Sequence, residues 1–368
     1  MKRSSLERTS QRTLRLRATS RPMTRHAYRA HLLDYTDSPL AGAHNVRYVD
    51  DGLLVVEKGS VVAAGDYHEL YRAYPDATII DYRGKLILPG FIDAHVHFAQ
   101  TQMIASYGRQ LLEWLESYVF PEEARFADRV HAARIAGFFL RELLRNGTTS
   151  ALVLGTVHPV SVDCLAQEAL RLDLRLILGK VLMDRNAPEN LKDSAQSGYD
   201  ESKALIERWH GRERLQYAVT PRFAPTSTPR QLELAGALVK EYPGTYVHSH
   251  LAENQSEVAW VRELFPEQES YTAVYDRFGL LTPRSLYAHG IQLSDAELEL
   301  LAARRASIAF CPTSNLFLGS GLFPHARACA AGVKVAIGTD VGAGTSLSVL
   351  RTLSEAYKVL QLQHQSLS

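Results

Sequence analysis

The chain has 368 residues, of which 46% are hydrophobic and 22% charged, so it has the composition of a folded globular protein and the length for a large core. Its formal net charge of +1 gives no reason to expect nucleic acid or a membrane as a partner, and no apolar run is long enough to span a bilayer. The three cysteines contain no Cys-x-x-Cys pair, which argues against a disulfide framework and favours a reducing compartment, the cytoplasm.

Residues 1–22 differ in composition from the rest of the chain. They are rich in Arg, Ser and Thr, contain Glu7 as their single acidic residue, and lack the apolar segment of a secretory signal. A transit peptide has a similar composition. We expect instead a disordered extension, with Met23 as the natural beginning of the folded chain.

Residues 23–88 are predicted to form a small β-domain. The segments "HAYRAHLLDY", "GLLVVEKGSVVAAG" and "ATIIDYRGKLILPG" are apolar or alternating runs, and Gly, Asp and Asn interrupt them. Short runs of this kind, bounded by residues that favour turns, are typical of β-strands, and we expect the domain to be part of a β-sandwich.

Residues 89–368 are predicted to form a larger α/β domain. Apolar strand-like runs alternate there with amphipathic helical stretches at 128–145, 229–240 and 294–304. Eight such strands have the number and order of a (β/α)8 barrel; they are predicted at 91–97, 149–154, 175–182, 215–220, 245–250, 285–289, 306–310 and 333–337. A doubly wound sheet shows the same alternation, but neither a GxGxxG nor a Walker motif supports it.

Polar residues cluster at the carboxyl ends of four of these predicted strands. His95 and His97 end the first strand, His250 the fifth and His289 the sixth, and the eighth runs into Asp340. A single strand-end histidine is more often a hydrogen-bonded structural residue than a ligand, but five such residues at one end of a barrel are hard to attribute to chance. In a barrel, active sites are built at this end of the strands.

These residue types suit a metal centre. His95, His97, His250 and Asp340 supply the nitrogen and oxygen donors of a Zn²⁺ site, although a His/Asp site also accepts Fe²⁺. A metal held in this way lowers the pKa of water towards about 7. His248 could replace His250, but we prefer His250 because an acid, Glu253, follows it three residues later.

The remaining strand-end residues suit acid–base chemistry. Glu253 is close enough in sequence to face the metal without binding it, which suits a proton shuttle, and Asp340 can accept a proton while touching the metal. His289 can hydrogen-bond the attacking group and stabilise charge. The zinc site of cytidine deaminases is excluded because it needs a P-C-x-x-C motif that this chain lacks.

The chain resembles the amidohydrolase superfamily, and within it the guanine deaminase branch, from about Arg25 to its end. The motifs that carry the resemblance follow the family's order: "LPGFIDAHVHFAQ", "GTTSA", "DRNAP", "TPRFAP", "HSHLAENQSEV", "AHGIQLS", "FCPTSNLFLGSG" and "GTDVGAGTS". The histidines and the aspartate belong to the whole superfamily. Gln100, the Arg222-Phe223 pair and the segment "LLEWLESYVFPEE" at 111–123 are more diagnostic of the branch.

The resemblance implies a homodimeric enzyme that deaminates guanine to xanthine and ammonia. It assigns one zinc ion per subunit to the four metal-ligand candidates, with His289 and Glu253 assisting. It also implies that Gln100 and Arg222 bind the carbonyl and ring nitrogens of the purine, that Phe223 lies beside the ring and that Trp114 lies near the mouth of the site.

The chain departs from the branch at its carboxyl end. Branch members continue for several dozen residues beyond the helix that follows the strand-eight aspartate and complete the small β-domain, whereas this chain ends at Ser368. We therefore expect a β-domain with an unpaired edge and exposed apolar surface. Two alternatives stay open: an aminohydrolase for another purine, a pyrimidine or a triazine, and an inactive truncated relative.

Overall fold

The computed structural model describes residues 25–37, 45–107 and 110–364. The predicted extension at 1–22 lies outside these residues. The described chain forms two compact units that divide at Pro89 and Gly90, and each is described by itself. None of the helices in the described ranges combines the length and the apolar character that a membrane crossing requires.

The first unit is a four-stranded sheet with one helix. Its strands lie in the order β3-β2-β1-β4, in which only the β1–β4 pair is parallel. The elements are β1 (His26–Tyr35), β2 (Val46–Glu57), β3 (Ser60–Asp66), α1 (Tyr67–Ala73) and β4 (Thr78–Ile87). Asp66 caps α1 by accepting hydrogen bonds from two backbone N–H groups of its first turn. Within this unit Val61 and Leu86, which lie on the edge strands β3 and β4, are exposed.

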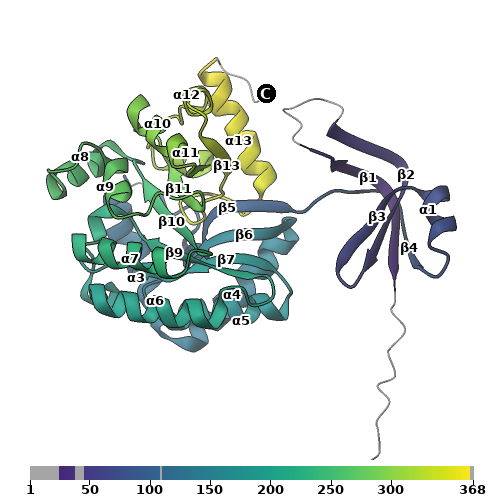
Figure 1. Cartoon of the computed structure of the whole chain (residues 1–368), viewed down its shortest axis with the longest axis horizontal. Helices are drawn as coiled ribbons and strands as arrows, with labels where there is room; N and C mark the ends of the chain where they lie inside the picture. Colours follow the sequence, from purple (N-terminus) through teal and green to yellow (C-terminus); the bar gives the residue numbers. More distant parts are fainter. Residues whose placement is uncertain (1–24, 38–44, 108–109, 365–368) are drawn as a thin grey trace, which may run out of the picture. The chain divides into compact units, whose positions relative to one another are not determined.

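The second unit is a nearly closed barrel of parallel strands with helices around it (Figure 1), which confirms the predicted (β/α)8 fold. Eight strands follow one another in space as they do in sequence, and β8 pairs with β9 beside this path. The strands are β5 (Phe91–His97), β6 (Thr148–Leu154), β7 (Arg175–Gly179), β8 (Val181–Leu182), β9 (Leu215–Pro221), β10 (Tyr246–Leu251), β11 (Ser285–His289), β12 (Ser307–Phe310) and β13 (Lys334–Ile337).

Helices follow the strands along the chain, as the alternating pattern predicts. The α-helices of this unit are α2 (Leu111–Trp114), α3 (Phe120–Ala124), α4 (Arg129–Arg145), α5 (Pro159–Arg171), α6 (Ala195–Trp209), α7 (Pro229–Glu241), α8 (Gln255–Leu264), α9 (Tyr271–Arg277), α10 (Asp295–Ala303), α11 (Pro312–Phe317), α12 (His325–Ala330) and α13 (Val349–Leu362). A capping box formed by Ser294 and Glu297 opens α10. A π-helical turn at Leu115–Val119 joins α2 to α3.

One predicted strand differs from the structure. The run at 175–182 divides into β7 and β8 at Lys180, whose backbone N–H donates to the Tyr217 hydroxyl (3.2 Å) instead of a neighbouring strand. The buried ammonium of Lys180 contacts Asp193 and the carbonyl of Val181. Gly179 permits the close approach at this point, since a Cβ there would lie 2.1 Å from the Ala218 carbonyl oxygen.

Backbone contacts between the first and last barrel strands bring their carboxyl ends together. The N–H of Asp340 donates to the carbonyl of His95 (2.9 Å), and the N–H of His97 donates to the carbonyl of Val341 (2.9 Å). The buried carboxylate of Asp93 accepts hydrogen bonds from the N–H and the hydroxyl of Thr339. The loop after β13 is therefore held against β5, more than 200 residues away in sequence.

Candidate metal centre and active site

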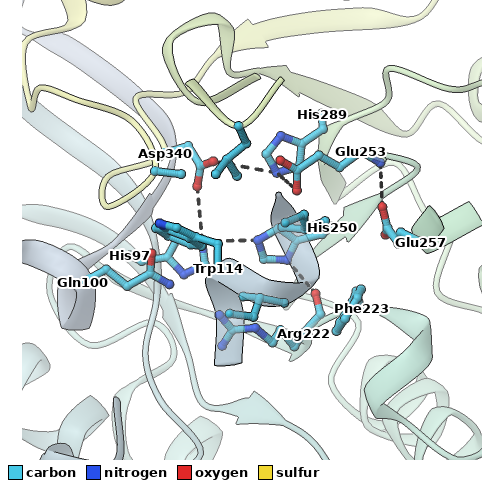
Figure 2. Close-up of a pocket in the computed structure, with 14 residues that line it drawn as sticks. His97, Gln100, Trp114, Arg222, Phe223, His250, Glu253, Glu257, His289 and Asp340 are labelled. Carbon is cyan, nitrogen blue, oxygen red and sulfur yellow. Dashed lines mark hydrogen bonds and ion pairs between the residues drawn. The ribbon is translucent and has the colours of Figure 1, made fainter. Parts of the chain in front are cut away.

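The predicted strand-end residues converge on one pocket (Figure 2). His97, His250, Glu253, His289 and Asp340 all line it, and its empty volume is about 410 Å³, the size of a site for a small molecule. His95 contacts this set, with its Nε2 3.1 Å from Asp340 Oδ1. Parallel strands end at the same rim of the barrel, which is why residues from four strands meet here.

A group of nitrogen and oxygen donors in this pocket fits a divalent metal. One potential ligand atom from each of His95, His250, His289 and Asp340 lies within 4.8 Å of the others. His97 lies beside this group, with its Nε2 3.3 Å from Asp340 Oδ1 and 3.2 Å from His250 Nε2. Three imidazoles and one carboxylate at such distances are a donor set that Zn²⁺ uses.

The protonation of the group also fits a metal. Burial lowers the pKa of His97 and, more strongly, that of His250, so both imidazoles are neutral and have a lone pair to donate. The Nε2 atom of His95 is buried and has no hydrogen-bond partner. Buried polar atoms without a partner are unfavourable, and a bound cation would supply the partner.

The geometry distinguishes the two histidines of β10. His250 lies in the pocket, and its Nδ1–H donates to the carbonyl of Arg222 (2.6 Å), which leaves Nε2 directed at the donor group. The Nε2 of His248 instead lies 2.7 Å from Nδ1 of His95. His248 is therefore placed to orient His95 from outside the pocket, as outer partners of metal-binding histidines do.

Backbone strain marks two of the strand-end residues. His289 (φ 76°) and Asp340 (φ 50°) both adopt the left-handed conformation, which is uncommon for residues other than glycine. Such conformations persist only where the surroundings impose them, and they concentrate at functional sites.

Glu253 is a buried carboxyl group beside His289. Its Oε2 lies 3.3 Å from His289 Nε2, and its Oε1 accepts a hydrogen bond from the Ser320 hydroxyl (3.2 Å). Burial, reinforced by the negative charges of Asp340 and Glu257, raises the pKa of Glu253 well above its ordinary value. The surroundings of Glu253 therefore favour the protonated form of its carboxyl group.

His289 is held in one orientation by Asn315. The side-chain amide nitrogen of Asn315 lies 2.9 Å from Nδ1 of His289, so the ring accepts at Nδ1 and carries its proton on Nε2, facing Glu253 and Asp340. Burial lowers the pKa of His289 to about 3. A neutral imidazole can donate this Nε2–H without competing for a proton.

The wall opposite His289 carries the predicted substrate residues. Gln100, Trp114, Arg222 and Phe223 all line the pocket. Trp114 packs with Phe223 in an apolar cluster, and its indole N–H donates to the carbonyl of Ser106 (2.8 Å). The pocket thus combines an apolar surface with one guanidinium and one amide, a combination suited to a flat polar ring.

Sequence reasoning missed several residues around the pocket. Glu123 contacts Gln100 and Arg222, and Glu257 accepts hydrogen bonds from the N–H groups of Glu253 and Asn254. Asn315 and Ser320, described above, were also missed. All of them lie within the family-like motifs at 111–123, 248–258 and 310–321, which is the signal that could have identified them.

Comparisons with known proteins agree with this site. Residues 86–366 match the amidohydrolase family. The chain is 50% identical to the guanine deaminase of Escherichia coli over 349 residues, which cover 94% of this chain and 80% of that protein. It is 45% identical to a probable guanine deaminase of Deinococcus radiodurans, with coverages of 91% and 77%.

Solved structures give the same result. The E. coli guanine deaminase structure superposes with a TM-score of 0.91 at 50% identity, covering 93% of this chain and 80% of that one. A guanine deaminase from C. acetobutylicum with guanine bound in its active site superposes with a TM-score of 0.86 at 30% identity, with coverages of 92% and 80%. The chain therefore belongs to the amidohydrolase family, and its predicted resemblance to the guanine deaminases is confirmed.

Proposed function

We propose that this chain deaminates guanine hydrolytically, converting guanine and water to xanthine and ammonia, with zinc held by His95, His97, His250 and Asp340. The observation that carries the proposal is the pocket itself, in which a donor group for a metal and a buried glutamic acid face an amide and a guanidinium. The 50% identity to a guanine deaminase over 94% of the chain supports guanine as the substrate.

The bound metal would supply a nucleophile at neutral pH, because coordination lowers the pKa of water. The two oxygens of Asp340 face different partners: Oδ1 faces His95 and His97, and Oδ2 lies 3.8 Å from His289. Asp340 can thus bind the metal through one oxygen and accept a proton on the other.

Glu253 delivers protons to the substrate. Burial raises its pKa and favours its protonated form, which gives its proton to a ring nitrogen of guanine. Glu253 then takes up the proton that Asp340 accepted from water and passes it to the amino group, which leaves as ammonia. His289 donates its Nε2–H to the oxygen that becomes the new carbonyl and stabilises the charge that develops there.

Gln100 and Arg222 bind the carbonyl and ring nitrogens of guanine, while Phe223 and Trp114 flank the flat ring. The apolar walls exclude water and strengthen these polar contacts. We further propose that the protein acts in the cytoplasm as a homodimer with one zinc ion per subunit.

The decisive experiment combines metal analysis with a guanine assay on the purified chain. We expect about one zinc ion per subunit, loss of guanine absorbance and release of an equal amount of ammonia. A protein that binds metal and releases ammonia from another heterocycle, while leaving guanine unchanged, contradicts the proposed substrate. A protein without metal and without ammonia release is an inactive relative.

A further inference from the structure

Glu123 is a buried carboxylate that joins the two polar residues of the substrate wall. It lies in α3, is fully inaccessible to solvent, and does not line the pocket. Its Oε1 accepts a hydrogen bond from the Gln100 side-chain amide (3.0 Å), and its Oε2 accepts one from the Arg222 guanidinium (2.8 Å). One side chain thus contacts two residues that are 122 positions apart in the sequence, at 100 and 222.

These contacts determine which way the amide of Gln100 points. A carboxylate only accepts hydrogen bonds, so the amide NH₂ must face Glu123. The amide oxygen then faces the backbone N–H of Gly342, from which it accepts at 3.1 Å. With the amide reversed, its oxygen would face the carboxylate of Glu123 and its NH₂ group would face the N–H of Gly342, and neither pair could form a hydrogen bond.

The same carboxylate fixes the guanidinium of Arg222. The ion pair is almost completely buried, with side-chain exposures of 3% for Arg222 and 0% for Glu123. The guanidinium also lies over the ring of Phe120, which precedes Glu123 in α3. Since one nitrogen is occupied by Glu123, the remaining N–H groups of the rigid fork are available to the pocket.

We propose that Glu123 is a positioning residue that holds Gln100 and Arg222 in the orientation needed to recognise an oxygen-bearing purine. The inference rests on the proposed function and deepens it, since it concerns how the same site selects its substrate. Glu123 does not touch the substrate; it acts through the two residues that do.

Glu123→Gln tests this inference because it keeps the size of the side chain and removes the charge and the second acceptor. The readout is the pair of inhibition constants for hypoxanthine, which has the ring carbonyl, and unsubstituted purine, which lacks it. We expect the constant for hypoxanthine to rise about 10-fold and that for purine to change less than about 3-fold. The KM for guanine should rise more than kcat falls.

Glu122→Gln is the matched control. Glu122 is the neighbouring acid, it pairs with Arg125, and it does not line the pocket. Its variant should keep both inhibition constants and the metal content of the unmodified chain. A purely structural role for Glu123 predicts a lower melting temperature with an unchanged ratio of the two constants.

If Glu123→Gln does not fold, Glu123→Asp replaces it. This variant keeps the charge but is one methylene shorter, so it reaches one partner and not both, and the ratio should shift in the same direction by a smaller factor. An unchanged ratio in the folded variant overturns the inference alone. Absence of guanine turnover in the unmodified chain overturns both the inference and the proposed function.

Discussion

Replacing Glu253 with glutamine is expected to abolish most guanine turnover without disturbing the metal centre. Glu253 is 3% exposed, and burial favours its neutral, protonated form, so the substitution keeps a neutral polar side chain of the same size at this position. The new amide oxygen can still accept the hydrogen bond from Ser320. The fold and its stability should therefore change little.

The loss of turnover follows from the chemistry of the group. An amide cannot donate and recover a proton, and a positioned acid–base group contributes roughly 10²–10⁴-fold to a rate. This factor corresponds to about 3–5 kcal/mol in activation free energy. Because Glu253 is not one of the four proposed metal ligands, metal content should stay at the level of the unmodified chain.

The assay measures kcat from guanine absorbance, metal by elemental analysis and stability by thermal unfolding. Glu299→Gln, which changes an exposed glutamate on α10, is the matched control and should behave as the unmodified chain. If Glu253→Gln retains metal and turns guanine over within about fivefold of the unmodified rate, another group transfers the proton and the assigned role is wrong.

Three further predictions concern the metal, the substrate wall and pH. Removing the metal with a chelator should abolish turnover and lower the melting temperature by several degrees, because ligand binding to the folded state stabilises it. Adding zinc should restore turnover and melting temperature in the unmodified chain but not in the His97→Ala variant. Arg222→Lys keeps a positive charge beside Glu123 but loses the planar fork, so kcat/KM for guanine should fall about 10–100-fold with metal content unchanged, and near-normal turnover would contradict guanine recognition by Arg222. Burial raises the pKa of Glu257 from 4.5 to about 7, so the folded chain binds this proton more tightly than the unfolded chain does. The contribution of Glu257 to the free energy of unfolding is therefore present below pH 4.5 and is lost as pH rises through about 7. Over this window the free energy of unfolding of the unmodified chain should fall by up to about 3 kcal/mol relative to that of Glu257→Gln. Denaturant titrations at several pH values measure this difference, and a pH-independent difference would contradict the assigned pKa.

Much of the barrel could be predicted because its strands are local features. β5 and β11 have the predicted bounds, and the other strands begin or end within a few residues of them. An apolar run bounded by turn residues, followed by an amphipathic helix, is encoded in neighbouring residues and needs no knowledge of the rest of the chain. Placing His95, His97, His250, His289 and Asp340 at strand ends then followed from counting along each run.

What lies around those residues depends on contacts between distant segments. Local spacing favoured His250 over His248 through Glu253, but two histidines two residues apart share one face of a strand, so the pattern alone gave no role to His248. The structure shows that His250 enters the pocket and that His248 contacts His95. The role of Glu123 was equally hidden, because a Pro-Glu-Glu segment is typical of an exposed helix start.

The sequence by itself determined the order of strands and helices, the residue types at the strand ends, and hence the class of chemistry. Periodicity and residue type are properties of short segments, so one chain is enough to recognise them. Only the tertiary structure decided that Asp340 meets His95 across the barrel closure and that Glu123 joins Gln100 to Arg222. Those contacts arise when the barrel closes and the segment containing α3 packs over its rim, and no local pattern of residues specifies them.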